Sequence, residues 1–159
     1  PLVLRLGTHE LELRRLQGHT ADDLVLIDRT TGVVFAGGLV FADRVPTTPH
    51  ADLPRWLASL DALEPLLMSG GRPLTVVPSH GPVHTGGYGL QQTRDWLRWL
   101  GGLMRESAAQ GLDLGELLSA PVPARFAGWA AQPAELHRSL TQLYPSHERA
   151  ALQPAANRP

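Results

Sequence analysis

The sequence predicts a mixed α/β domain. Five short apolar runs have the pattern of β-strands, at residues 2–6, 10–14, 24–27, 33–36 and 74–77. A helical pattern fills residues 52–68, so strand, helix and strand follow one another, as is typical of an α/β sheet. With 159 residues, of which 43% are hydrophobic and 18% charged, the chain is long enough to bury one core.

The first four runs predict two β-hairpins. Residues 2–6 and 10–14 are joined by a short polar turn, and the second run alternates apolar and charged residues. Residues 24–27 and 33–36 are separated by a turn that ends in Gly32, which suits a positive φ. The second pair of runs is continuously apolar, so we expect it to lie in a sheet covered on both sides.

Two long helices are expected next. Leucine and tryptophan recur at spacings of three and four over residues 52–68, with Asp52 as the N-cap and Gly70 after the end. The second helix, residues 91–110, carries a broad apolar stripe and stops before Gly111. Its Trp96 and Trp99 fit helix packing better than cofactor stacking.

The C-terminal part is predicted to be broken into short pieces by prolines. Helical patterns remain at residues 114–118 and 134–143, and about the last ten residues are expected to fray. The run at 74–77 ends at Pro78, so residues 79–82 are expected to form a loop at the end of a strand.

Composition excludes several classes of function. All fourteen basic residues are arginines interleaved with acids, and the net charge is −1, so no nucleic-acid partner is expected. No run approaches 18 apolar residues, which excludes a membrane span. The chain has no cysteine, so any metal must be held by histidine, aspartate or glutamate.

Two of the seven histidines are placed where ligands gather in α/β sheets. His19 stands between Gly18 and Thr20 just before an apolar run, and His80 follows another run. Taken alone, each also fits a capping or hydrogen-bonded loop residue. Four other histidines are expected to be solvated surface residues: His9, His50, His137 and His147.

Three sequence motifs resemble those of a known family. They are GHTADDLVL at residues 18–26, GVVFAGGLVF at residues 32–41 and VVPSHGP at residues 76–82. They are similar to the second half of metallo-β-lactamase-fold hydrolases, in which GHTxxD, an apolar hairpin, AGD, a long helix and VPGHG occur in this order. FADRVP and WLASL, at residues 41–46 and 56–60, resemble most closely the quinoprotein relay system zinc metallohydrolases.

The resemblance implies a zinc site at one edge of a four-layer αββα sandwich. His19 matches the third histidine of the first zinc site, and His80 matches a ligand of the second. Gly38 stands where the family usually has an aspartate that bridges two metals, so either one or two zinc ions are expected. Thr20 and Asp23 are candidates to orient the His19 imidazole by accepting a hydrogen bond from its other ring nitrogen. Alternatively, they cap the start of the strand.

The resemblance also implies that this sequence is the second half of the fold with a helical C-terminal extension. We expect residues 1–88 to be that half and residues 89–159 the extension. The family's HxHxDH motif does not occur in the sequence, so two imidazoles alone cannot complete a zinc site. The segment is therefore expected to be inactive alone and to pair with a first half, or to form a homodimer.

The expected function is zinc-dependent hydrolysis, in which a metal-activated water attacks an ester, thioester or amide-like small molecule. No catalytic side chain is assigned, and four residues are candidates for a substrate-pocket wall: Phe41, Asp43, His84 and Tyr88. Asp43, five residues after Gly38, could reach back to the metal, but the favoured role is a surface charge or a partner of Arg44. The alternative is a non-catalytic binding or scaffold protein of this fold with a degenerate metal site. The relay subgroup also implies a periplasmic location.

Overall fold

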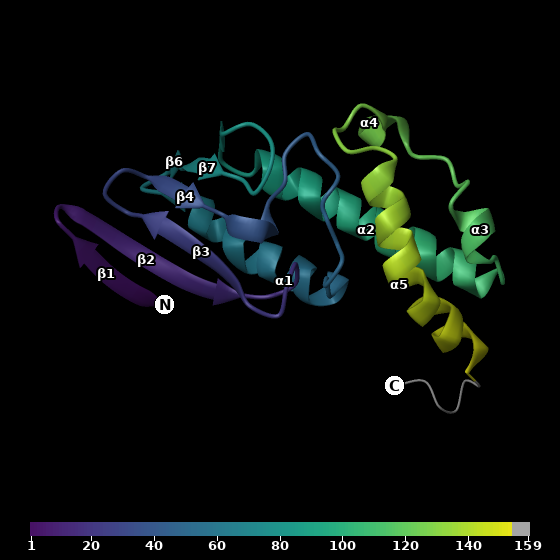
Figure 1. The fold of residues 1–159 in the computed structure, drawn as a ribbon. Helices are drawn as coiled ribbons and strands as arrows, with labels where there is room; N and C mark the ends of the chain where they lie inside the picture. Colours follow the sequence, from purple (N-terminus) through teal and green to yellow (C-terminus); the bar gives the residue numbers. More distant parts are fainter. Residues whose placement is uncertain (154–159) are drawn as a thin grey trace.

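The computed structural model describes residues 1–153, and a six-stranded sheet forms one end of the molecule (Figure 1). The strand order is β1-β2-β3-β4-β7-β8. Its members are β1 (Leu2–Leu6), β2 (His9–Leu16), β3 (Asp23–Asp28), β4 (Val33–Phe35), β7 (Thr75–Val77) and β8 (His84–Thr85). Neighbours are antiparallel except β4 and β7, which are parallel. Both predicted hairpins are confirmed.

Helix α1 (Leu53–Leu63) connects the parallel strands β4 and β7. The predicted N-cap is confirmed, because the Asp52 carboxylate accepts a hydrogen bond from the backbone N–H of Arg55. The predicted end at residue 68 is wrong. Pro65 has no N–H to donate to the preceding turn, which interrupts the α-helical hydrogen bonds, and the chain changes to a 3₁₀ turn, η2 (Glu64–Leu67).

A small hairpin follows η2. Strands β5 (Met68–Ser69) and β6 (Arg72–Pro73) pair on either side of Gly70 and Gly71. These glycines were expected only to end the helix. A second 3₁₀ turn, η1 (Gly37–Leu39), leads from β4 toward α1. Both β5–β6 and β8 are two-residue strands, too short for a periodic pattern to reveal.

The C-terminal part of the described chain is helical. Its helices are α2 (Tyr88–Ala109), α3 (Leu114–Leu117), α4 (Ala124–Ala127) and α5 (Ala134–Leu152). Helix α2 begins three residues before the predicted start, and Gly111 follows its end with φ 74° as predicted. The predicted end of α5 at residue 143 is wrong, because α5 continues through Pro145. The buried Tyr144 before Pro145 and the partly buried Ala151 after it both pack against the core.

Residues 154–159, part of the predicted frayed end, lie outside the described residues. Figure 1 shows the long helix α2 joining the sheet end of the molecule to α3, α4 and α5. None of the helices formed by residues 1–153 combines the length and the apolarity needed to cross a membrane.

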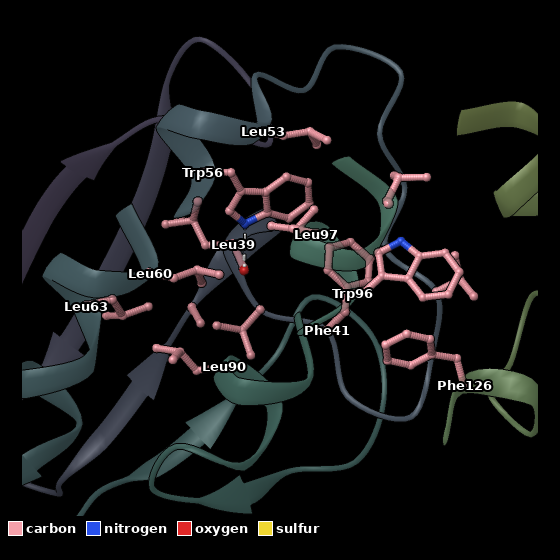
Figure 2. Packing of buried hydrophobic residues seen from close by; sticks show 14 of the residues in the cluster. Leu39, Phe41, Leu53, Trp56, Leu60, Leu63, Leu90, Trp96, Leu97 and Phe126 are labelled. Atoms are coloured by element: carbon pink, nitrogen blue, oxygen red, sulfur yellow. Dashed lines mark hydrogen bonds between the residues drawn. The ribbon is translucent and has the colours of Figure 1, made fainter. Parts of the chain in front are cut away.

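One face of the sheet carries the core. Val25, Ile27, Val34 and Val76 are fully buried and belong to one core cluster with leucines of α1 and α2. Figure 1 shows these helices lying along the sheet. Figure 2 shows Trp56 of α1 among the buried leucines, and its indole N–H donates a 3.0 Å hydrogen bond to the carbonyl of Leu39. The hydrogen bond satisfies a buried carbonyl and ties α1 to η1.

A second aromatic cluster joins α2 to the C-terminal helices. Trp96 is fully buried, and its ring lies 4.9 Å from Trp99 and 5.1 Å from Phe126, centroid to centroid. This packing confirms the structural role expected for the two tryptophans (Figure 2).

The opposite face of the sheet is open in the described part of the chain. The register places alternate apolar residues of four strands on this side, among them Leu2, Leu4, Leu24 and Phe35, which are 45–59% exposed. The expectation of a sheet covered on both sides is therefore wrong for residues 1–153. The runs are apolar on both faces, but only one face meets helices.

Candidate functional site

His19 lies in the loop between β2 and β3, and a glycine fixes the path of that loop. Gly18 has φ 133°, and a Cβ there would lie 2.1 Å from the Cα of Trp56. The carbonyl of Gly18 accepts a 2.8 Å hydrogen bond from the backbone N–H of Asp52, the N-cap of α1. The loop and the start of α1 are thus in direct backbone contact, which only glycine permits.

The carboxylate of Asp23 organises the same loop. It accepts hydrogen bonds from the backbone N–H groups of His19 (3.1 Å) and Thr20 (3.0 Å) and from the Thr20 hydroxyl (2.9 Å). The His19 Nδ1 atom lies 3.5 Å from Asp23 Oδ1, at the outer limit of a hydrogen bond. Asp23 and Thr20 therefore act as a cap of the loop, and their orienting role toward the imidazole stays a prediction.

The imidazole of His19 is enclosed by aromatic rings. Its centroid lies 5.1 Å from the Trp56 ring and 5.9 Å from the Phe41 ring, and its side chain is 21% exposed. The Nε2 atom lies 3.3 Å from the hydroxyl of Thr47. Each ring nitrogen thus faces an oxygen atom of the protein.

Gly38 lies directly against His19. A Cβ at residue 38 would lie 2.2 Å from His19 Nδ1, far inside van der Waals contact. The two positions that the family resemblance relates are therefore neighbours in the structure. The imidazole occupies the room that a side chain at residue 38 would need.

His80 lies in the loop after β7, and the loop runs alongside residues 40–42. The N–H of Ala42 donates to the His80 carbonyl (3.0 Å), and the N–H of Ser79 donates to the Val40 carbonyl (2.8 Å). The exposed imidazole of His80 stacks on Phe41 with a centroid distance of 5.6 Å and an interplanar angle of 28°. Both candidate ligands therefore contact the ring of Phe41, which is 1% exposed.

The donor set that this chain offers does not fit a zinc ion by itself. Zinc in proteins takes three or four protein ligands, and here the candidates are two imidazoles. Residues 1–153 hold no group of three histidine, cysteine, aspartate or glutamate side chains arranged for a metal. Any zinc site at His19 or His80 needs at least one further ligand from outside these residues.

Asp43 has partners that the sequence did not reveal. Its carboxylate accepts hydrogen bonds from the Tyr88 hydroxyl (2.7 Å) and the Gln92 amide (2.9 Å), and its own N–H donates to Gln92 Oε1 (2.7 Å). It is exposed, as expected, but it pairs with α2 and not with Arg44. The hydrogen bonds from Gln92 and Tyr88 lower the pKa of Asp43, and the same contact raises the pKa of Tyr88.

The Asp43 cluster braces the segment that runs beside His80. Asp43 has φ 54°, a left-handed conformation that costs energy for a residue with a side chain. His84 lies next to this cluster, with its ring 5.4 Å from that of Tyr88, and its Nε2 accepts the N–H of Gly89 at 3.1 Å. Asp43, His84 and Tyr88 are thus engaged with one another and with α2, and their place in a substrate pocket stays a prediction.

The remaining histidines follow the expectation with one correction. His50 and His137 are exposed, and His9 is exposed while its Nδ1 lies 2.7 Å from Asp28 Oδ2. His147 was expected at the surface and is half-buried in α5. Burial and the nearby Arg105 lower the pKa of His147.

Solved structures share this architecture. The metallo-beta-lactamase from Pontibacter korlensis matches 61% of this chain with a TM-score of 0.53 and 30% sequence identity. The chain has part of the metallo-β-lactamase fold. Metallo-beta-lactamase IND-7 matches the same share with a TM-score of 0.52 and 23% identity.

The match covers part of each protein. The chain spans 45% of the Pontibacter korlensis protein and 44% of IND-7, which is less than half of either length. No protein-family model and no curated protein matches the sequence. The relay-system subgroup and the boundary between residues 88 and 89 stay predictions.

Proposed function

We propose that this chain is part of a metal-dependent hydrolase of the metallo-β-lactamase fold and supplies two histidines to its metal centre. The observation that carries the proposal is the convergence of His19 and His80. The two imidazoles come from loops about 60 residues apart in sequence and contact the same phenyl ring of Phe41. Loops at strand ends are where this class of sheet binds its ligands.

The chain's own residues would position these imidazoles and leave the remaining coordination to another segment. Gly18 and Asp23 hold the His19 loop, and the backbone contacts of Ala42 and Ser79 hold the His80 loop. Two imidazoles are too few for zinc, so residues 1–153 alone are proposed to be inactive. The ester, thioester or amide-like substrate and the periplasmic location belong to the same proposal.

The open sheet face supports a second half of the fold as the partner. Leu2, Leu4, Leu24 and Phe35 form an apolar surface, and exposed apolar patches of this kind mark interaction sites. The solved relatives are more than twice as long as the part that this chain matches. We propose that the first half of the fold covers this face. The arrangement can be tested by light scattering of the protein that contains both proposed halves of the fold, called here the natural-length protein. A stable homodimer that Leu24→Glu dissociates would contradict it.

The test of the proposed function is the zinc content of the natural-length protein after dialysis. His19→Ala is expected to lose most of the bound zinc and the hydrolytic activity, because it removes one ligand. His50→Ala, which changes an exposed histidine, serves as the matched control and is expected to keep both. Equal zinc content in His19→Ala and His50→Ala would refute the proposal.

A second candidate is favoured by the contact between His19 and Gly38. A side chain at residue 38 is excluded while His19 holds its position, so the site has the geometry of one that has lost a ligand and closed over the space. A non-catalytic binding or scaffold protein would have this property. In that case Gly38→Asp restores neither metal binding nor hydrolysis. In a depleted but working site it raises zinc occupancy, because the imidazole turns toward the metal.

A further inference from the structure

A cavity of about 680 Å³ lies away from His19 and His80, between the start of α1, the middle of α2 and the C-terminal half of α5. Its volume is in the range of small-molecule sites. A second cavity of about 390 Å³ shares Arg105 and His147 with it, so the hollow continues along the groove between α2 and α5. Helix α5 therefore lines this hollow in addition to packing on the core.

The floor of the first cavity is apolar. It is formed by side chains from all three helices: Leu53, Leu57, Leu97, Met104 and Leu143. Such a surface binds an aliphatic or aromatic body by removing it from water.

Two glycines of α2 keep this cavity open. Glycine is a poor helix former, yet Gly101 and Gly102 are adjacent in the interior of α2 and line the cavity. Packing does not require them, because a Cβ at Gly101 would meet its nearest neighbour, Leu53, at an ordinary 3.7 Å. At Gly102 the nearest atom would be 3.9 Å away. The absence of side chains here preserves space and costs helix stability.

The wall of the cavity is cationic. Arg98 and Arg105 are seven residues apart and lie on the same side of α2 as the two glycines. Neither arginine is within 4 Å of a carboxylate among residues 1–153. The one acid in the lining, Asp52, already caps α1 and pairs with Arg55.

We propose that this cavity binds a small amphipathic carboxylate, with its body on the leucine floor and its charge held by Arg105 beside His147. Arg98 supplies a second positive charge at the rim. A neutral ligand of the same shape would fill the floor without a partner for Arg105, so the charge of the ligand decides its affinity. The site is independent of the proposed metal centre.

The test is calorimetric titration of the full chain with sodium octanoate and, separately, with the neutral octanamide. Arg105→Gln is expected to weaken octanoate binding about tenfold and to leave octanamide binding unchanged. Arg72→Gln changes an exposed arginine on β6, away from the cavity lining, and is the matched control with no expected effect. Equal octanoate affinity in wild type and Arg105→Gln, or no octanoate binding to wild type, overturns the proposal.

A second variant locates the bound ligand. Gly102→Leu fills the cavity with a good helix former, so the fold is kept and both ligands are expected to lose their binding. Gly102→Ala is expected to raise the unfolding midpoint of the free protein, because helix propensity improves without a clash. Undiminished octanoate binding to Gly102→Leu would place the ligand elsewhere, such as on the open sheet face, and would overturn the proposal.

Discussion

The imidazole of His19 rests on Gly38, with its Nδ1 atom 2.2 Å from the place where a Cβ of residue 38 would stand. His19 lies in the loop between β2 and β3 and Gly38 lies in η1, and a side chain at residue 38 can be accommodated only if His19 moves. The family resemblance implies a metal-bridging aspartate at residue 38. The contact with His19 therefore bears on whether residue 38 can carry a metal ligand.

We predict that Gly38→Ala destabilises the protein by about 1–3 kcal/mol, because the new methyl group overlaps the imidazole. In a His19→Ala background the same change is expected to be neutral or slightly stabilising, since alanine restricts the unfolded chain. Urea unfolding of the two single variants and the double variant measures the coupling. Additive effects would mean that the imidazole does not occupy this space.

Gly18→Ala is predicted to be more damaging than any other glycine substitution in a turn of the β1–β3 region. Its Cβ would overlap the backbone of Trp56 at 2.1 Å, and the φ of 133° is unfavourable for alanine. Gly7→Ala is the control, because Gly7 has φ 59° and open space around it, and it should cost about 1–2 kcal/mol. Thermal unfolding should place Gly18→Ala well below Gly7→Ala, and equal midpoints would contradict the close approach of the His19 loop to α1.

Trp56→Phe is predicted to cost about 1–3 kcal/mol more than Trp96→Phe. Both indoles are fully buried, but only the Trp56 N–H has a partner in residues 1–153, the carbonyl of Leu39. Its replacement leaves that buried carbonyl unsatisfied, whereas Trp96→Phe removes a donor that was already unpaired. Chemical denaturation of both variants compares the two, and a larger loss for Trp96→Phe would argue against the α1–η1 hydrogen bond.

Asp28 is predicted to make stability depend on pH in the acid range. Hydrogen bonds from Thr31, then from His9 and the backbone of Thr30, lower the pKa of its carboxyl from 3.8 to about 2. Its contribution is therefore complete above pH 3.8, where the unfolded carboxyl is also ionised, and is lost as the pH falls toward 2.

The measurement is the difference in urea midpoint between wild type and Asp28→Asn. The difference should be largest near pH 6 and should shrink between pH 3.8 and about 2. Asn retains the shape and one acceptor, so the change reports the charge. A difference that does not vary with pH would show that the carboxylate is not stabilised in the folded state.

Much of the sheet could be predicted from local patterns. The alternation in residues 10–14 and the turn at Gly32 define two hairpins, and both are present. Asp52 and Gly111 mark the start of α1 and the end of α2 because capping depends on single residues. These features require no knowledge of distant contacts.

Features set by distant contacts could not be predicted. The Asp43–Gln92 hydrogen bond joins residues 49 positions apart, and no local signal relates them. Helix α5 continues through Pro145 because the buried Tyr144 before it and the partly buried Ala151 after it pack against the core, which outweighs the local penalty. The apolar runs of β3 and β4 gave no sign of which face the helices would leave open.

The candidate site, too, could be predicted only in part. The motifs brought His19 and His80 to notice, and the structure places both on Phe41. The motifs also identified Gly38 as a departure from the family. They could not show that the imidazole of His19 fills the space beside residue 38, because side-chain conformation depends on the packing of Trp56 and Thr47 around it.

The most direct test of the proposed metal centre is a zinc titration of the natural-length protein followed by NMR of the His19 imidazole nitrogens. His19→Ala assigns the signals. We predict that one ring nitrogen of His19 shifts as zinc binds and that its contact with Thr47 is replaced by the metal. An unchanged His19 spectrum at saturating zinc would contradict the assignment of this residue as a metal ligand.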